Sequence, residues 1–121
     1  MKRDLDLLRN ILITIEGSDT DLDTNSFLHL CDDIETIDYH IYLLADAGYI
    51  DYYDISCCNG SRYPQYLVKY LTSDGCDYLS SIKDDNVWSH VKKKINKVGD
   101  SVTLETIKII GSKFILQYLG L

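Results

Sequence analysis

Proline, tryptophan and histidine are scarce in this chain, which has one, one and three of them among its 121 residues. No apolar run reaches the roughly 18 residues that a membrane-spanning helix needs, so no span is predicted. The opening Met-Lys-Arg-Asp lacks the apolar core of a signal peptide, and we expect a cytoplasmic protein. The length and the hydrophobic content of 45% fit one compact soluble domain.

Motifs with a catalytic or metal-binding mechanism are also missing. The four cysteines form no C-x-x-C pair, and the three histidines fall on separate predicted elements. In the acidic loop, the sixth and twelfth places counted from Asp19 hold Thr24 and Leu30, where a calcium loop needs glycine and glutamate. There is no nucleophile elbow and no phosphate-binding glycine loop. We therefore expect reduced thiols, no metal, no cofactor and no enzymatic activity.

Positive charge is sparse in the N-terminal part of the chain. The net charge is −7, and residues 1–50 carry three Lys/Arg against eleven Asp/Glu, whereas residues 83–121 carry seven against four. A nucleic-acid binder usually concentrates positive charge on the surface that meets the phosphates. Only the C-terminal third of this chain has more basic than acidic residues.

Hydrophobic periodicity predicts a first helix over residues 4–16, which Gly17 ends. Residues 27–30 form a candidate short strand. A second helix is predicted over residues 34–47, with Asp32 or Asp33 as its N-cap, because Asp side chains accept the free amides of a first turn. Its predicted apolar stripe consists of Ile34, Ile37, Ile41 and Leu44.

A β-hairpin and further helices are predicted to follow. Residues 49–56 and 64–72 are rich in Tyr, Ile, Leu and Val, which favour strands, and residues 58–61 mark the turn between them. Thr72 or Ser73 caps a helix that reaches Ile82. Residues 84–86 break the chain before an amphipathic helix that ends at Gly99, with Val87, Trp88, Val91, Ile95 and Val98 as its apolar side. A last helix begins near Thr103 or Leu104.

This order of elements predicts an α+β, winged-helix-like domain: helix, short strand, helix and two-stranded wing, with additional C-terminal helices. We expect residues 1–82 to form the winged-helix core and residues 83–121 to form a helical extension within a single domain.

Several motifs resemble an uncharacterised bacterial and phage family, a domain of unknown function. They are the opening MKRDLDLLR, then YHIYLL before Ala47-Gly48, Leu71-Thr72 with Gly75, DDNVW at residues 84–88, and the ending LGL. The resemblance implies a small winged-helix-like protein of prophage or mobile-element contexts, with no catalytic residues. The acidic loop after Gly17 and the adjacent Cys57-Cys58 depart from the family pattern.

The second predicted helix suggests a protein-binding face. It contains no Lys or Arg, and tyrosines stand among acids on the side opposite its apolar stripe. Tyrosine is enriched at protein interfaces because it offers a large area and loses little entropy. A basic protein partner is the favoured ligand; the alternative is that both tyrosines lie flat against the hairpin at the edge of the core. The candidate face consists of Glu35, Asp38, Tyr39, Tyr42 and Asp46.

DNA binding is the alternative function. In a winged helix the helix before the hairpin normally enters the major groove, where these carboxylates would be repelled by phosphates. Compensating contacts would have to come from cations on other elements. These candidates are Arg3, Arg9, Arg62, Lys69, Lys93, Lys94 and Lys97, the last three sharing an outer face with His90.

The last predicted helix is apolar over more than one face, so it must be buried on several sides. Either it inserts into its own domain or a second copy of the chain covers it, which makes a homodimer plausible. The candidate dimer residues are Ile107, Ile110, Phe114, Ile115 and Tyr118.

Overall fold

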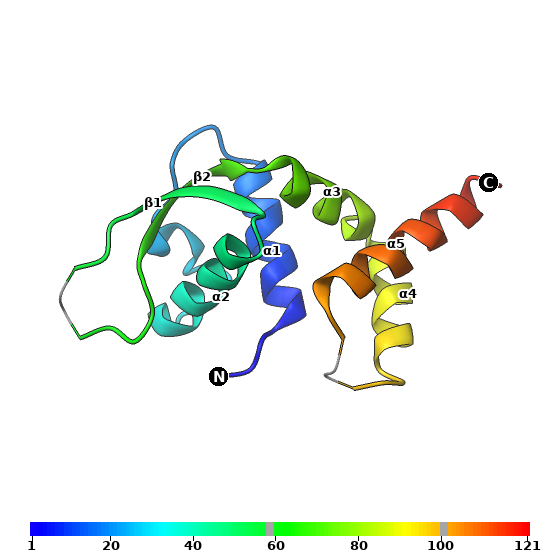
Figure 1. Ribbon diagram of the computed structural model, residues 1–121, viewed down its shortest axis with the longest axis horizontal. Helices are drawn as coiled ribbons and strands as arrows, with labels where there is room; N and C mark the ends of the chain where they lie inside the picture. The colour runs from blue at the N-terminus through cyan, green and yellow to red at the C-terminus, as the bar shows by residue number, and fades with distance from the viewer. Residues whose placement is uncertain (58–59, 100–101) are drawn as a thin grey trace. The chain divides into compact units, whose positions relative to one another are not determined.

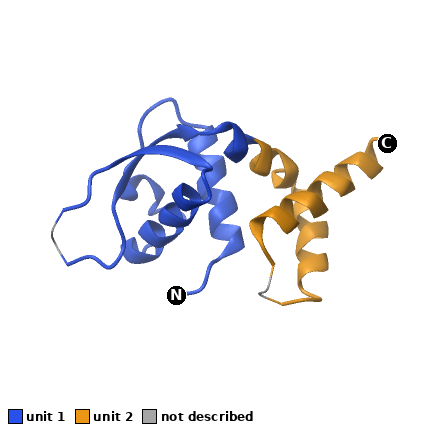
Figure 2. Cartoon of the chain, in the orientation of Figure 1, with its two compact units in different colours: residues 1–76 blue, residues 77–121 orange. Residues whose placement is uncertain are grey.

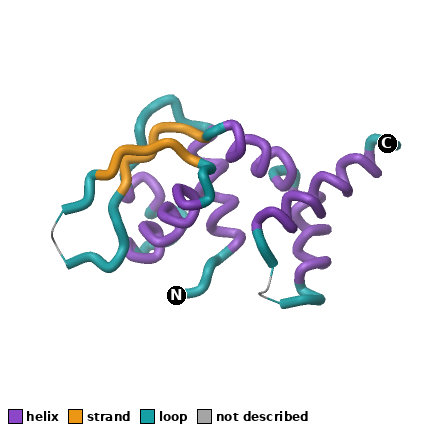
Figure 3. The backbone as a smooth tube through the Cα atoms, viewed as in Figure 1, coloured by secondary structure: helices purple, strands orange, loops and turns teal. Residues whose placement is uncertain are grey.

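The computed structural model describes residues 1–57, 60–99 and 102–121. Within these residues the helices dominate and two strands form one antiparallel sheet (Figures 1 and 3). The elements in chain order are α1 (Leu5–Glu16), the 3-10 helix η1 (Thr24–Phe27), α2 (Ile34–Asp46), β1 (Ile50–Asp54), β2 (Tyr66–Leu71), α3 (Ser73–Ile82), α4 (Asp85–Ile95) and α5 (Leu104–Tyr118).

The chain divides into two compact units, residues 1–76 and residues 77–121 (Figure 2). The sequence predicts the division after residue 82, whereas the structure has it within α3. We call them unit 1 and unit 2. Unit 1 holds the elements of the predicted winged-helix core, and unit 2 holds the C-terminal helices.

Helices α1 and α2 supply most of the buried side chains of unit 1. Asp4 caps α1, and its carboxylate accepts a hydrogen bond from the Leu7 amide at 3.2 Å. The buried apolar residues on these two helices are Leu7, Leu8, Ile11, Leu12, Ile15, Ile37, Ile41 and Leu44. Ile34, predicted to lie in the same stripe, is 49% exposed, so the buried side of α2 begins one turn later.

The segment between α1 and α2 corrects one prediction. Residues 27–30 do not form a strand. The chain instead makes the 3-10 helix η1, in which Phe27 is fully buried. The short extended contact lies earlier, where Leu22 and Val68 exchange two backbone hydrogen bonds of 2.8 Å. Asp33 occupies the N-cap of α2, but its carboxylate accepts a bond from the Thr36 hydroxyl and not from a backbone amide.

Strands β1 and β2 form the predicted hairpin. Ile50 pairs with Leu71 and Asp54 pairs with Tyr66, with a bulge between Asp51 and Tyr52. The predicted turn at residues 58–61 lies partly outside the described residues. The order α1, a Leu22 bridge, η1, α2 and the β1–β2 hairpin gives an α+β, winged-helix-like arrangement.

A tight corner joins the end of α2 to the start of α3. Gly48 ends α2 with a φ of 78°, and its carbonyl accepts a hydrogen bond of 2.5 Å from the Thr72 hydroxyl. The same Thr72 oxygen accepts the Gly75 amide at 3.1 Å, which caps α3. A Cβ at position 75 would lie 2.0 Å from the Tyr49 carbonyl oxygen, so only glycine fits there. The Leu-Thr-x-x-Gly pattern therefore has a structural cause.

In unit 2, α4 packs against α5. Asp84, within the predicted break at residues 84–86, caps α4 and accepts hydrogen bonds from the Asn86 and Val87 amides at 2.9 and 3.2 Å. A Cβ at Gly111 of α5 would lie 2.1 Å from the Ser81 carbonyl oxygen, so α5 meets the end of α3 backbone to backbone. Val98, predicted on the apolar side of α4, is 64% exposed because the helix ends at Ile95.

Candidate interaction surface

Four residues of the predicted protein-binding face share one side of α2. Glu35, Tyr39, Tyr42 and Asp46 are spaced by four, three and four residues, which places them in a single row along a helix. Glu35 and Asp46 are exposed, and the two tyrosines between them are half-buried. We call this row the α2 stripe.

Tyr39 of the α2 stripe has two aromatic neighbours, one of them between the strands of the hairpin. The Tyr39 ring lies 4.9 Å from the Tyr63 ring and 5.3 Å from the His40 ring, measured between centroids. Burial raises the pKa of the Tyr66 hydroxyl, with further contributions from Tyr52, Asp54 and Tyr42. Tyr39 thus packs against a residue between the two strands, as the alternative interpretation of the sequence has it, and both Tyr39 and Tyr42 keep part of each ring accessible.

Asp38 does not belong to the exposed face, which corrects the prediction. Its side chain is only 4% exposed and accepts a hydrogen bond of 2.5 Å from the Thr24 hydroxyl in η1. Burial raises the pKa of the Asp38 carboxyl, while hydrogen bonds from Thr24 and Gln65 oppose that rise. This carboxylate therefore ties η1 to α2 and offers nothing to a ligand.

His40 is fully buried and lies two residues after Asp38 in α2. Its Nε2 accepts the backbone amide of Asp4 at 2.8 Å, and its Nδ1 donates to the Thr36 carbonyl at 2.7 Å. These two bonds require the neutral ring with its proton on Nδ1. Burial lowers the pKa of His40 despite the opposing effects of Thr36 and Asp4. The residue fixes the start of α1 and has a structural role.

The candidate nucleic-acid contacts are divided between the units. Arg3, Arg9, Arg62 and Lys69 lie in unit 1, and Lys93, Lys94 and Lys97 lie in unit 2. Lys69 is already engaged, because its Nζ lies 3.3 Å from an Asp51 carboxylate oxygen and faces the rings of Tyr53 and Tyr70 at 4.7 and 5.3 Å. The Arg62 guanidinium lies 5.9 Å from the centre of the Tyr63 ring.

The predicted dimer residues differ widely in exposure. Ile107 is fully buried, so it belongs to the interior and not to an interface, which corrects the prediction. Tyr118 is 84% exposed, and the other three predicted residues, Ile110, Phe114 and Ile115, are half-buried. His90 is not on the outer basic face of α4 either, because its ring stacks on Phe114 with centroids 4.2 Å apart.

Sequence reasoning missed the tyrosines of the hairpin. Tyr52 and Tyr66 stack with centroids 4.2 Å apart, and Tyr63 lies against Tyr39. Ten tyrosines in 121 residues, concentrated around α2 and the strands, were the available signal.

Among the described residues, no three His, Cys, Asp or Glu side chains are grouped as a metal site. No helix within the described ranges is long and apolar enough to cross a membrane.

The fold and these surfaces define a small α+β protein of winged-helix-like arrangement. Residues 2–101 match the model of the family described as "Hypothetical protein (DUF2513)", and the chain belongs to that family. It is 33% identical over 123 residues to an uncharacterised protein of Haemophilus influenzae, a match that covers 99% of this chain and 100% of the relative. No solved structure matches.

Proposed function

We propose that this protein is a non-catalytic regulatory module that binds a basic segment of another protein through the α2 stripe. The observation that carries the proposal is the pair of exposed carboxylates, Glu35 and Asp46, at the two ends of a row whose middle is formed by two half-buried tyrosines. The proposal includes the prophage or mobile-element setting that the motif resemblance implies.

The geometry of the α2 stripe suits a cationic peptide. Glu35 and Asp46 are eleven residues apart, which corresponds to about 16 Å along a helix axis. Two Lys or Arg side chains four or six residues apart in an extended chain lie on the same face, about 13 or 20 Å apart, and their long stems can adjust to this distance. Tyr39 would lose little entropy on binding, because its contact with Tyr63 already restricts its ring.

Charge argues for a protein ligand over DNA. Unit 1 carries 14 Asp/Glu against five Lys/Arg, and α2, which occupies the place of a recognition helix, contains no basic residue. Phosphate neutralisation supplies most non-specific DNA affinity, so an acidic helix in a groove opposes the main attractive force. The ion pair between Lys69 and Asp51 removes one of the few cations near the hairpin.

The test replaces Tyr42 with the photo-crosslinking amino acid p-benzoylphenylalanine and irradiates cells of a host that carries the gene. The same amino acid at Ser80, an exposed position of α3, is the control. We expect a protein adduct at Tyr42 that is absent at Ser80 and whose partner has a basic contact segment by mass spectrometry.

The variant Glu35→Gln with Asp46→Asn then separates charge from shape. It is expected to weaken binding of the identified segment at least about tenfold, because two charge-assisted contacts are lost. The matched control, Asp19→Asn with Asp21→Asn, removes the same charge from an exposed loop and should leave the affinity unchanged. An adduct that nuclease digestion removes, together with duplex DNA binding at physiological salt, would reject the proposal in favour of DNA binding.

A further inference from the structure

A second surface, on the C-terminal half of α5, is apolar and open. Leu116, Tyr118, Leu119 and Leu121 are 46%, 84%, 64% and 85% exposed. Monomeric soluble proteins rarely expose contiguous apolar patches larger than a few hundred Å², and larger ones mark interaction sites. Leu116 and Leu119 are three positions apart and are therefore neighbours on the surface. The Leu121 amide donates to the Leu116 carbonyl at 2.8 Å, which brings Leu121 back beside Leu116, whereas Tyr118 lies at the pocket described next.

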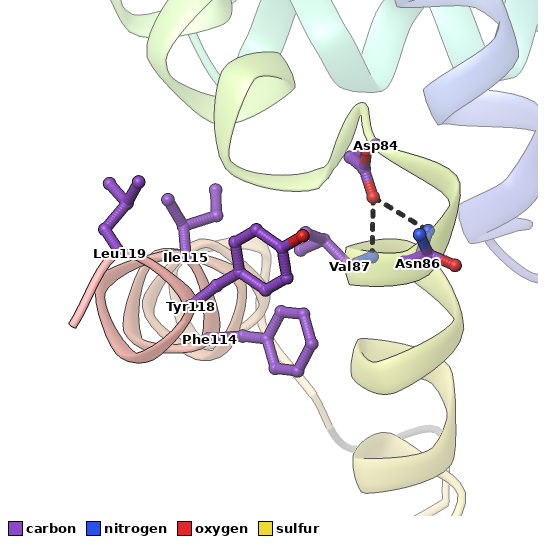
Figure 4. Close-up of a pocket in the computed structure, with 7 residues that line it drawn as sticks. All are labelled: Asp84, Asn86, Val87, Phe114, Ile115, Tyr118 and Leu119. Atoms are coloured by element: carbon purple, nitrogen blue, oxygen red, sulfur yellow. Dashed lines mark hydrogen bonds between the residues drawn. The ribbon is translucent and has the colours of Figure 1, made fainter.

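A pocket adjoins this patch within unit 2. It has a volume of about 340 Å³ and lies between α5 and the first turn of α4. Phe114 and Tyr118 extend from α5 toward Val87 and Asp84, with Ile115 and Leu119 beside them (Figure 4). The Asp84 carboxylate is occupied by the two amides that it caps, so the pocket presents mainly apolar side chains.

From these features we infer that a second copy of this chain packs against α5, each copy inserting side chains of its α5 into the pocket of the other. A small apolar ligand is a poorer occupant, because the patch continues past the pocket to Ile109, Leu116 and Leu121, which a ligand of that size would leave in water. The exposed side chains together offer several hundred Å² of area, of the order of the about 800 Å² per partner that a standard interface buries.

Self-complementarity and charge both favour a second copy. Leu119 lines the pocket, and the exposed Leu121 follows it by two residues, so a protruding side chain and a pocket lie close together. That is the requirement of a two-fold interface where one patch meets itself. Unit 2 carries seven Lys/Arg against five Asp/Glu, so two such surfaces repel each other little. Contact between two copies of unit 1, with 14 acids against five bases each, would be opposed by repulsion.

The experiment is sedimentation velocity over a range of protein concentrations, on the full chain and two double variants. Leu116→Lys with Leu119→Lys places charge in the patch near the C-terminus of α5, where a cation agrees with the helix dipole and folding should persist. Ile55→Lys with Val98→Lys adds the same charge at exposed apolar positions outside the patch. Circular dichroism confirms that each variant is folded.

We expect the unmodified chain to sediment with twice its mass of 13.9 kDa at micromolar concentration. The α5 variant should show a dissociation constant raised by more than about 100-fold, because each substitution occurs twice in a two-fold interface. The control variant, and the α2-stripe variant Glu35→Gln with Asp46→Asn, should remain dimeric. A monomeric unmodified chain at 100-fold higher concentration, or a dimer that the α5 substitutions leave intact, would overturn the inference.

Discussion

Replacing Gly75 by alanine should have two opposite effects on stability, a gain in helix propensity and a loss from a steric clash. In an ordinary helix the change is stabilising by about 1 kcal/mol, because alanine has the better helix propensity. Here the new Cβ would lie 2.0 Å from the Tyr49 carbonyl oxygen, where ordinary contact starts at 3.4 Å. The obstructing atom belongs to the backbone, so relief requires moving the corner itself and weakening the Thr72 cap on the Gly75 amide.

Overpacking of this kind costs about 1–3 kcal/mol, and the upper part of that range applies because no side chain can rotate away. With the propensity gain subtracted, we expect Gly75→Ala to lower the free energy of unfolding by about 2 kcal/mol. Urea unfolding followed by far-ultraviolet circular dichroism should show a midpoint lower by about 1–2 M. The control Ser80→Ala, at an exposed position of the same helix, should stay within about 0.5 kcal/mol. A Gly75→Ala protein as stable as the original would refute the steric account of the Leu-Thr-x-x-Gly pattern.

Three further substitutions test buried contacts. Burial lowers the pKa of His40, so the unfolded chain takes up the extra proton at a higher pH than the folded chain does. Stability should therefore fall as the pH drops from the ordinary value of 6.5 toward the lower pKa of the folded state. His40→Gln keeps an acceptor for the Asp4 amide and should reduce this dependence of the melting temperature on pH, measured by thermal melts at a series of pH values. Asp38→Asn should be neutral or stabilising at pH 7 while Asp38→Ala costs about 1–3 kcal/mol, because burial disfavours the charge but the acceptor is needed; equal losses in urea unfolding would contradict this. Gly111→Ala should shift the thermal midpoint of unit 2 downward by several degrees when followed by Trp88 fluorescence, because its Cβ would meet the Ser81 carbonyl at 2.1 Å; an unchanged midpoint would rule out that close approach.

The sequence predicts the helices and the hairpin well because each has a local signal. The periodicity of α1, the glycine that ends α2, the Tyr-rich strands and the Asp84 cap all act within a few neighbouring residues. The strand prediction for residues 27–30 is wrong because no such local signal is decisive there. A short apolar run fits a strand or a helix equally, and the burial of Phe27 in η1 depends on distant packing.

The candidate face is only partly predictable, because polarity is an imperfect guide to exposure. Asp38 and His40 are polar yet buried, and Ile34 is apolar yet half exposed, so the actual buried side of α2 is rotated from the one drawn through its apolar residues. The compensating hydrogen bonds come from Thr24 and Asp4, which are 14 and 36 residues away in the chain. No pattern within α2 itself carries that information.

Helix α3 belongs partly to each unit, and this has a practical consequence for cutting the chain into fragments. A fragment that stops at Cys76 keeps four residues of α3, about one turn, and a single turn has no stability of its own in water. Those four residues include Gly75, whose amide the Thr72 hydroxyl needs as its partner at the corner. An expression fragment of the N-terminal half should therefore run through Ile82, so that it contains the whole of α3.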